Sequence, residues 1–231
     1  MRAFFNTPLF GVTITIITFL LGKYINEKTK KAILNPILLS AIMIMVFLSH
    51  FNIEYETYNS GGRLVSFFIA PATVVLAVPL YKNIRLLRKK WLPILIGITM
   101  GSLAGLFTVY VLCKLLDLDR TILISMLPKS TTAAISTSLS VQIGGIPALT
   151  MAFTAVTGIG GNVLGEYVFN IFKINDKVSK GVSLGTASHA VGTVKAMELG
   201  ETEGALSSLS ITVAGIINVF LIPWFMNLLS I

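Results

Sequence analysis

The sequence predicts an all-α integral membrane protein with about seven or eight hydrophobic helical segments. Of its 231 residues, 54% are apolar and only 12% are charged, whereas charged residues make up about a quarter of an ordinary soluble domain. A helix that crosses the hydrocarbon layer of about 30 Å needs about 20 apolar residues. Roughly seven or eight crossings with short loops therefore use up the whole chain, and we expect no soluble domain.

Apolar runs alternate with charged or glycine- and proline-rich stretches along the chain. We expect each run to be helical, because a backbone exposed to lipid has to satisfy its own hydrogen bonds. The runs cover residues 8–22, 33–50, 64–81, 92–116, 121–141, 148–172, 182–197 and 205–229.

The net charge of +8 predicts membrane orientation and contact with lipid headgroups, not binding of nucleic acid, because the basic residues lie in short loops between apolar runs. Lys and Arg concentrate in cytoplasmic loops. Glu54 and Glu56 then fit an outside loop between two inside loops. The basic residues are Lys23, Lys28, Lys30 and Lys31 in the first inside loop, and Lys82, Arg85, Arg88, Lys89 and Lys90 in the second.

The second half of the chain fits this rule only if one segment enters and leaves on the same side. With eight crossings, the basic loop at 173–180 would face outside and the acidic stretch at 198–203 would face inside. The best candidate for re-entry is 121–141, the most polar run; that it spans the membrane is the alternative. With re-entry, the amino terminus lies outside and the carboxyl terminus inside a membrane that we expect to be the bacterial cytoplasmic membrane.

Re-entry also turns the flanking segments into an inverted three-plus-three repeat, a recurrent plan of secondary transporters with interrupted central helices. Both central segments have such interruptions: 70–79 contains two prolines, and 185–193 contains two glycines and a histidine. The alternative is that these residues are ordinary kinks of membrane helices. We predict a single domain, residues 1–231, with repeat one at about 33–116, the polar segment at about 121–141 and repeat two at about 148–229.

Ionisable groups in apolar segments are functional candidates, because each costs roughly 2.5–3.5 kcal/mol on insertion scales. His189 lies in the second interrupted segment, where it could bind an anion when protonated, bond a hydroxyl or titrate near neutral pH. The alternative is a helix-packing role. Lys129, beside Pro128, could attract a carboxylate or extend to the membrane interface.

Hydroxyl side chains add neutral donors, and the positive ends of half-helices would also favour an anion. The alternative is that these Ser and Thr residues hold helices together. The predicted substrate-binding residues are Pro71, Thr73, Lys129, Ser130, Thr131, Ser188, His189 and Thr193.

Enzymatic and metal sites are not predicted. Residues 181–185 match the G-x-S-x-G pattern, but that motif requires a strand-turn-helix context, and this stretch opens an apolar helix. The two histidines, His50 and His189, are far apart, and Cys113 is the single cysteine, so we predict neither a metal site nor a cofactor. We expect a protein that is not an enzyme.

Glycines with a spacing of four predict close helix contacts and are compatible with a homodimer. They are Gly97, Gly101 and Gly105, then Gly161 and Gly165, then Gly181 and Gly185.

Several motifs carry a family resemblance: LPKS at 127–130, QIGGIPAL at 142–149, TGI at 157–159, GVSLGTASHAVGT at 181–193 and EGALSS at 203–208. Together they resemble the LrgB/CidB family, also described as antiholin-like or murein-hydrolase-regulator membrane proteins. Stretches at 35–36, 71–74 and 77–81 look like the amino-terminal half of the same family, so the resemblance covers nearly the whole chain.

The resemblance implies two functions of different classes. One is control of murein hydrolase activity and cell lysis with a holin-like partner of the LrgA/CidA type, expected to be a separate membrane protein. The other is transport of small carboxylates, namely pyruvate in bacteria and glycolate or glycerate in plastids. A pure interaction partner needs no polar residues at the membrane midplane. We therefore predict carboxylate transport by alternating access, with antiholin-like regulation as the alternative.

Overall fold

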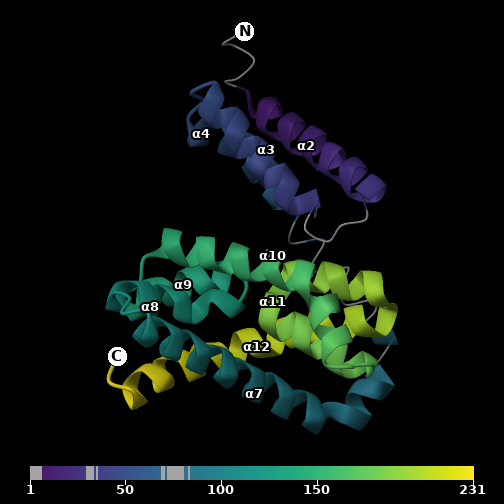
Figure 1. The fold of residues 1–231 in the computed structure, drawn as a ribbon, viewed down its shortest axis with the longest axis vertical. Coiled ribbons are helices and arrows are strands. Elements are labelled where there is room, and N and C mark those ends of the chain that lie inside the picture. The colour runs from purple at the N-terminus through teal and green to yellow at the C-terminus, as the bar shows by residue number, and fades with distance from the viewer. Residues whose placement is uncertain (1–6, 30–33, 35, 69–70, 72–80, 83) are drawn as a thin grey trace. The chain divides into compact units, whose positions relative to one another are not determined.

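Helices form all the regular structure that the computed structural model describes, over residues 7–29, 34, 36–68, 71, 81–82 and 84–231 (Figure 1). Some are long and apolar enough to cross a membrane, which confirms the predicted all-α membrane protein. Within the described residues these helices are Pro8–Thr29, Arg88–Leu115, Pro147–Ile171 and Glu201–Leu228. The chain divides into two units, residues 1–75 and residues 76–231.

The first unit contains α2 (Pro8–Thr29), α3 (Pro36–His50) and α4 (Tyr55–Phe67). Glycines bring α2 and α4 together, because a Cβ atom on Gly11 would meet the backbone of Tyr58 and Gly61. Between α2 and α3, the hydroxyls of Thr18 and Ser40 form a hydrogen bond of 2.8 Å. The first predicted interruption, at 70–79, lies outside the described residues apart from Pro71.

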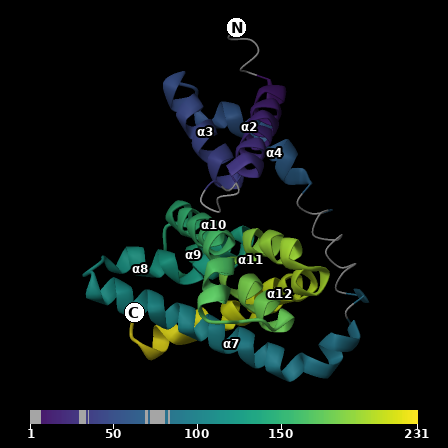
Figure 2. The ribbon, with the colours of Figure 1, turned by 45° about the vertical axis from the view of Figure 1, so that its right-hand side comes forward.

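The second unit carries the site. In it, α11 contacts both α10 and α12, and α7 packs against α11 and α12 (Figures 1 and 2). Buried apolar side chains such as Ile98 and Leu206 fill the contact between α7, α11 and α12. The elements are α7 (Ile84–Leu115), α8 (Arg120–Met126), the 3₁₀ helix η2 (Leu127–Ser130), α9 (Ala133–Ile143), α10 (Pro147–Ile171), α11 (Lys177–Leu199) and α12 (Glu201–Leu228).

The polar run at 121–141 consists of short helices and not of one long helix. The pieces α8, η2 and α9 have 7, 4 and 11 residues, whereas a crossing needs about 20. Pro128 lies in the first turn of η2, where its missing N–H is tolerated. Gly144, with φ of 81°, ends α9, because the left-handed conformation favours glycine.

After α9 the chain returns to α8. The backbone N–H of Ile146 donates to the hydroxyl of Ser125 at 2.9 Å, and the hydroxyl of Thr150 donates to the carbonyl of Ser125 at 2.8 Å. The hydroxyls of Thr150 and Ser140 also form a hydrogen bond of 2.7 Å. The start of α10 therefore lies against α8, and the re-entry of 121–141 stays a prediction.

The second predicted interruption is present in α11. His189 has φ of 43° and ψ of −134° inside the helix, a conformation that is unfavourable for a residue with a Cβ atom. The ring Nε2 pairs with the carbonyl of Thr154 at 3.0 Å, and Asn162 donates to the carbonyl of Val191 at 2.9 Å. Hydrogen bonds from α10 therefore satisfy polar groups at the break.

Glycines of α10 leave room for this break. A Cβ atom on Gly158 would lie 2.6 Å from Cε1 of His189, and one on Gly161 would meet the side chain of Ser188. The predicted three-plus-three repeat and the predicted single domain both depend on how the two units are arranged, so both stay predictions.

Candidate functional site

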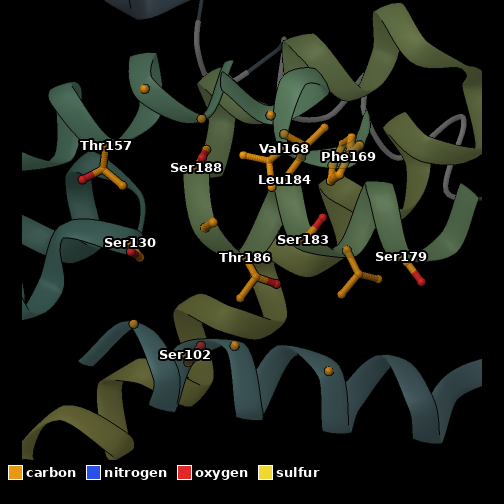
Figure 3. A pocket seen from close by; sticks show the side chains of 18 of the residues that line it. Ser102, Ser130, Thr157, Val168, Phe169, Ser179, Ser183, Leu184, Thr186 and Ser188 are labelled. Atoms are coloured by element: carbon orange, nitrogen blue, oxygen red, sulfur yellow. The ribbon is translucent and has the colours of Figure 1, made fainter. Parts of the chain in front are cut away.

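A cavity of about 830 Å³ lies in the second unit among α7, α10, α11 and η2. Its volume is within the range of small-molecule sites, roughly 300–1,000 Å³. Figure 3 shows the hydroxyls of Ser130 and Thr157 near one end, Thr186 in the middle and Ser179 near the other end. Most of the remaining wall is glycine or apolar side chain, so the few polar groups determine what it can bind.

The glycines of α7 create part of this space. Gly97, Gly101 and Gly105 all line the cavity, and a Cβ atom on Gly105 would have no neighbour within 4 Å in the described part of the chain. Their spacing predicts close helix contact, but here they leave room. The prediction is confirmed for Gly181 and Gly185, where a Cβ atom would collide with the backbone of α12.

Lys129 places a cation at the cavity wall. The turn of η2 holds it half-buried, and its Nζ donates to the hydroxyl of Ser130 at 3.3 Å. No ion pair joins it to a carboxylate within the described residues. Lys195, by contrast, pairs with Glu166 at 2.9 Å and Glu198 at 3.3 Å. An ammonium group without a counter-ion beside an apolar wall attracts an anion strongly, because the local dielectric constant is low.

The other end of the cavity contains an ion pair at the start of α11. Asp176 caps the helix by accepting from the backbone N–H of Ser179 at 2.8 Å and from its hydroxyl at 2.9 Å. Nζ of Lys90, on α7, lies 3.8 Å from Oδ1 of Asp176. The hydrogen bonds from Ser179, chiefly that of the backbone N–H, lower the pKa of Asp176, and Lys90 adds to the effect.

We expect Asp176→Ala to lower the free energy of unfolding by about 1 kcal/mol, the usual contribution of a helix cap. Because folding depresses the pKa of this carboxyl, its contribution is present above the unfolded-state pKa of about 3.9 and is lost as the pH falls through the lower folded-state pKa. Thermal unfolding in detergent from pH 7 to pH 3 measures both effects. Asp119→Ala is the control, because the bond from Thr121 to Asp119 is long, at 3.5 Å. Equal losses in the two variants at pH 7 would contradict the prediction.

Thr186 is the third polar feature of the wall. It is 5% exposed, and its Oγ1 is the one buried side-chain nitrogen or oxygen without a hydrogen-bond partner in the described part of the chain. Thr193, on the same helix, donates to the carbonyl of His189 at 3.0 Å and bonds the hydroxyl of Ser207 at 2.7 Å. Of these two threonines of α11, only Thr186, which lines the cavity, has an unpaired hydroxyl.

The cavity brings together only part of the predicted substrate-binding set. Lys129, Ser130 and Ser188 line it. Four others are described but are not among the residues that line it. Thr131 donates to the carbonyl of Pro128 at 2.8 Å, His189 and Thr193 make the bonds given above, and Pro71 belongs to the first unit. Thr73 lies outside the described residues.

Sequence reasoning missed polar groups that α7 and α12 contribute to the wall. Asn218 of α12 donates to the hydroxyl of Ser102 of α7 at 3.4 Å, and both side chains are buried. An amide inside the apolar run at 205–229 is the signal that could have identified this pair. Among the residues that the structure describes, no group of His, Cys, Asp and Glu could hold a metal ion.

Comparison with known proteins places these features in a family context. A sequence model of the LrgB-like family matches residues 15–228. The antiholin-like protein LrgB of Bacillus mycoides (strain KBAB4) is 38% identical over 221 residues, which cover 95% of this chain and 96% of that protein. The antiholin-like proteins LrgB of Bacillus cereus (strain B4264) and Bacillus anthracis (strain CDC 684 / NRRL 3495) are 37% identical with the same coverage. No solved structure matches the chain.

Proposed function

The chain belongs to the LrgB-like family, and from its cavity we propose that it carries a small carboxylate across the membrane by alternating access. The observation that supports this proposal most is the environment of Lys129. Its ammonium group borders a largely apolar cavity and has no acidic partner among the described residues. A carboxylate would supply the missing counter-ion.

The surrounding groups define how the anion would be held. The hydroxyls of Ser130 and Ser188 line the same cavity as Lys129, and each can donate to a carboxylate oxygen. Ser188 lines the cavity and directly precedes the break at His189, so the half-helix that follows begins next to the cavity wall, where its positive end would favour an anion. Movement of α11 about this break would open the cavity alternately to the two sides.

Uptake into proteoliposomes tests the proposal. We expect saturable uptake of labelled pyruvate or glycolate by the purified chain, with and without a pH gradient and with and without a holin-like partner. Protein-free liposomes are the control. No uptake under any of these conditions, from protein shown to be folded, would remove the carrier from consideration. The same proposal places the amino terminus outside and the carboxyl terminus inside the membrane. It includes a homodimer and no enzymatic step.

A second candidate function is antiholin-like regulation of murein hydrolase activity and lysis, together with a separate holin-like membrane protein of the LrgA/CidA type. The names of the relatives support this candidate, over 95% of the chain, and they say nothing of carboxylates. Expression with and without the holin-like protein, in a host that lacks both, would measure lysis and murein hydrolase activity. If Lys129→Met still regulates lysis, regulation does not depend on the cavity. If the variant loses both regulation and uptake, regulation is a consequence of transport.

A further inference from the structure

We infer that Thr186 is a specificity-determining residue, whose hydroxyl bonds a second oxygen of the ligand while Lys129 binds its carboxylate. The inference rests on the proposed function, because it requires a carboxylate in the cavity. It predicts that the site prefers carboxylates with a further oxo or hydroxyl group over alkyl carboxylates of the same length.

The unpaired hydroxyl is the first observation that carries the inference. Threonines within membrane helices usually donate to the carbonyl four residues earlier, as Thr99, Thr108 and Thr154 do at 2.9, 2.7 and 2.9 Å. Thr186 makes no such bond, although it is buried. A buried hydroxyl without a partner is costly, and a ligand that bonds it removes this cost.

The position of Thr186 is the second observation. Its methyl group packs against α7, because a Cβ atom on Gly101 would lie 3.4 Å from its Cγ2. A turn of about 120° around its Cα–Cβ bond can bring the hydroxyl to the position of the methyl group, and threonine in a helix occupies two such rotamers. In Figure 3, Thr186 faces the centre of the cavity, away from Ser130 at one end. Lys129 of η2 would therefore bind the anion, and Thr186 of α11 would bind the second oxygen.

The consequence for specificity follows from the unpaired group. A site that is built to bond a polar group rejects an analogue that lacks it, because the buried partner is left unpaired. For one neutral hydroxyl we expect a preference of roughly tenfold to a hundredfold.

Binding to the purified full chain in lipid nanodiscs tests the inference. The probes are butanoate, 2-hydroxybutanoate, 3-hydroxybutanoate and 2-oxobutanoate, which share one chain length and differ in the position of the second oxygen. We expect at least one substituted acid to bind roughly tenfold to a hundredfold tighter than butanoate. Thr186→Val should remove this preference, and Thr186→Ser should retain it. Thr108→Val, which changes an exposed hydroxyl of α7, is the matched control.

Thermal unfolding of the ligand-free variants gives a readout that does not depend on binding. Because Thr186→Val removes an unpaired hydroxyl, we expect it to unfold at the wild-type temperature or about 2–4 °C above it. Thr193→Val should instead lower the unfolding temperature, since it leaves the hydroxyl of Ser207 without its bond.

The outcomes separate the inference from the function on which it rests. If the wild type binds none of the four acids, carboxylate binding itself fails, and the role of Thr186 fails with it. If the wild type binds them all equally, or if Thr186→Val keeps the preference or unfolds well below the wild type, the role of Thr186 is overturned and the proposed function stands.

Discussion

Lys129→Met should reduce carboxylate uptake by about a hundredfold, because it removes the cation of the cavity while keeping a long side chain. A hydrogen bond between charged groups contributes about 1.5–3 kcal/mol, and the apolar wall of the cavity places Lys129 at the upper part of this range. A loss of about 3 kcal/mol corresponds to roughly a hundredfold in affinity. The initial rate of labelled uptake at low substrate concentration measures the effect.

Matched variants separate charge from folding. Lys129→Arg keeps the positive charge and should keep much of the uptake, although the guanidinium has a different shape. Lys195→Met is the control, because this side chain is only 20% exposed and pairs with Glu166 and Glu198 but does not line the cavity as the structure describes it. It should lower stability without changing substrate affinity. Uptake by Lys129→Met within about threefold of the wild type would favour the alternative that Lys129 extends to the membrane interface.

The interruption of α11 shows what a local sequence pattern can predict and what it cannot. Two glycines and a histidine in one apolar segment predict a break between 185 and 193, and the structure has it. The break occurs at His189, however, and not at a glycine, because Thr154 and Gly158 of α10 accommodate this side chain. Gly185 instead provides close contact with α12. Such contacts join residues that are far apart in sequence, so a local pattern cannot assign them.

The candidate site shows the same limit. The sequence identifies Lys129 as an ionisable group in a polar segment, but only the fold shows that it has no acidic partner in the described unit while Lys195 has two. Thr186 and Thr193 are equivalent in sequence, since both lie in the interrupted segment. They differ because Ser207 of α12 reaches one of them and not the other. A candidate list from sequence therefore contains residues of the right type whose partners are set by tertiary packing.

Gly185→Ala should destabilise the protein by about 3 kcal/mol, the upper part of the usual cost of overpacking. The added Cβ atom would collide with the carbonyl oxygen of Ser207 and lie 2.9 Å from its Cα and carbonyl carbon. Because these are backbone atoms, no rotamer change relieves the collision, and α11 has to move away from α12. Helices in membranes associate largely through such close packing, so the change acts on the main contact of the second unit. Unfolding in detergent measures the loss.

Gly105→Ala is the control for Gly185→Ala, because the same substitution meets open space. Apart from the adjoining backbone of its own helix, no atom of the described chain lies within 4 Å of the added Cβ atom, and alanine favours helix formation over glycine by up to about 1 kcal/mol. We therefore expect Gly105→Ala to unfold at the wild-type temperature or above it. Equal effects of the two substitutions would mean that helix propensity, and not contact between α11 and α12, sets the stability of this unit. A large loss in Gly185→Ala alone would show that the close contact between α11 and α12 before the break stabilises this unit.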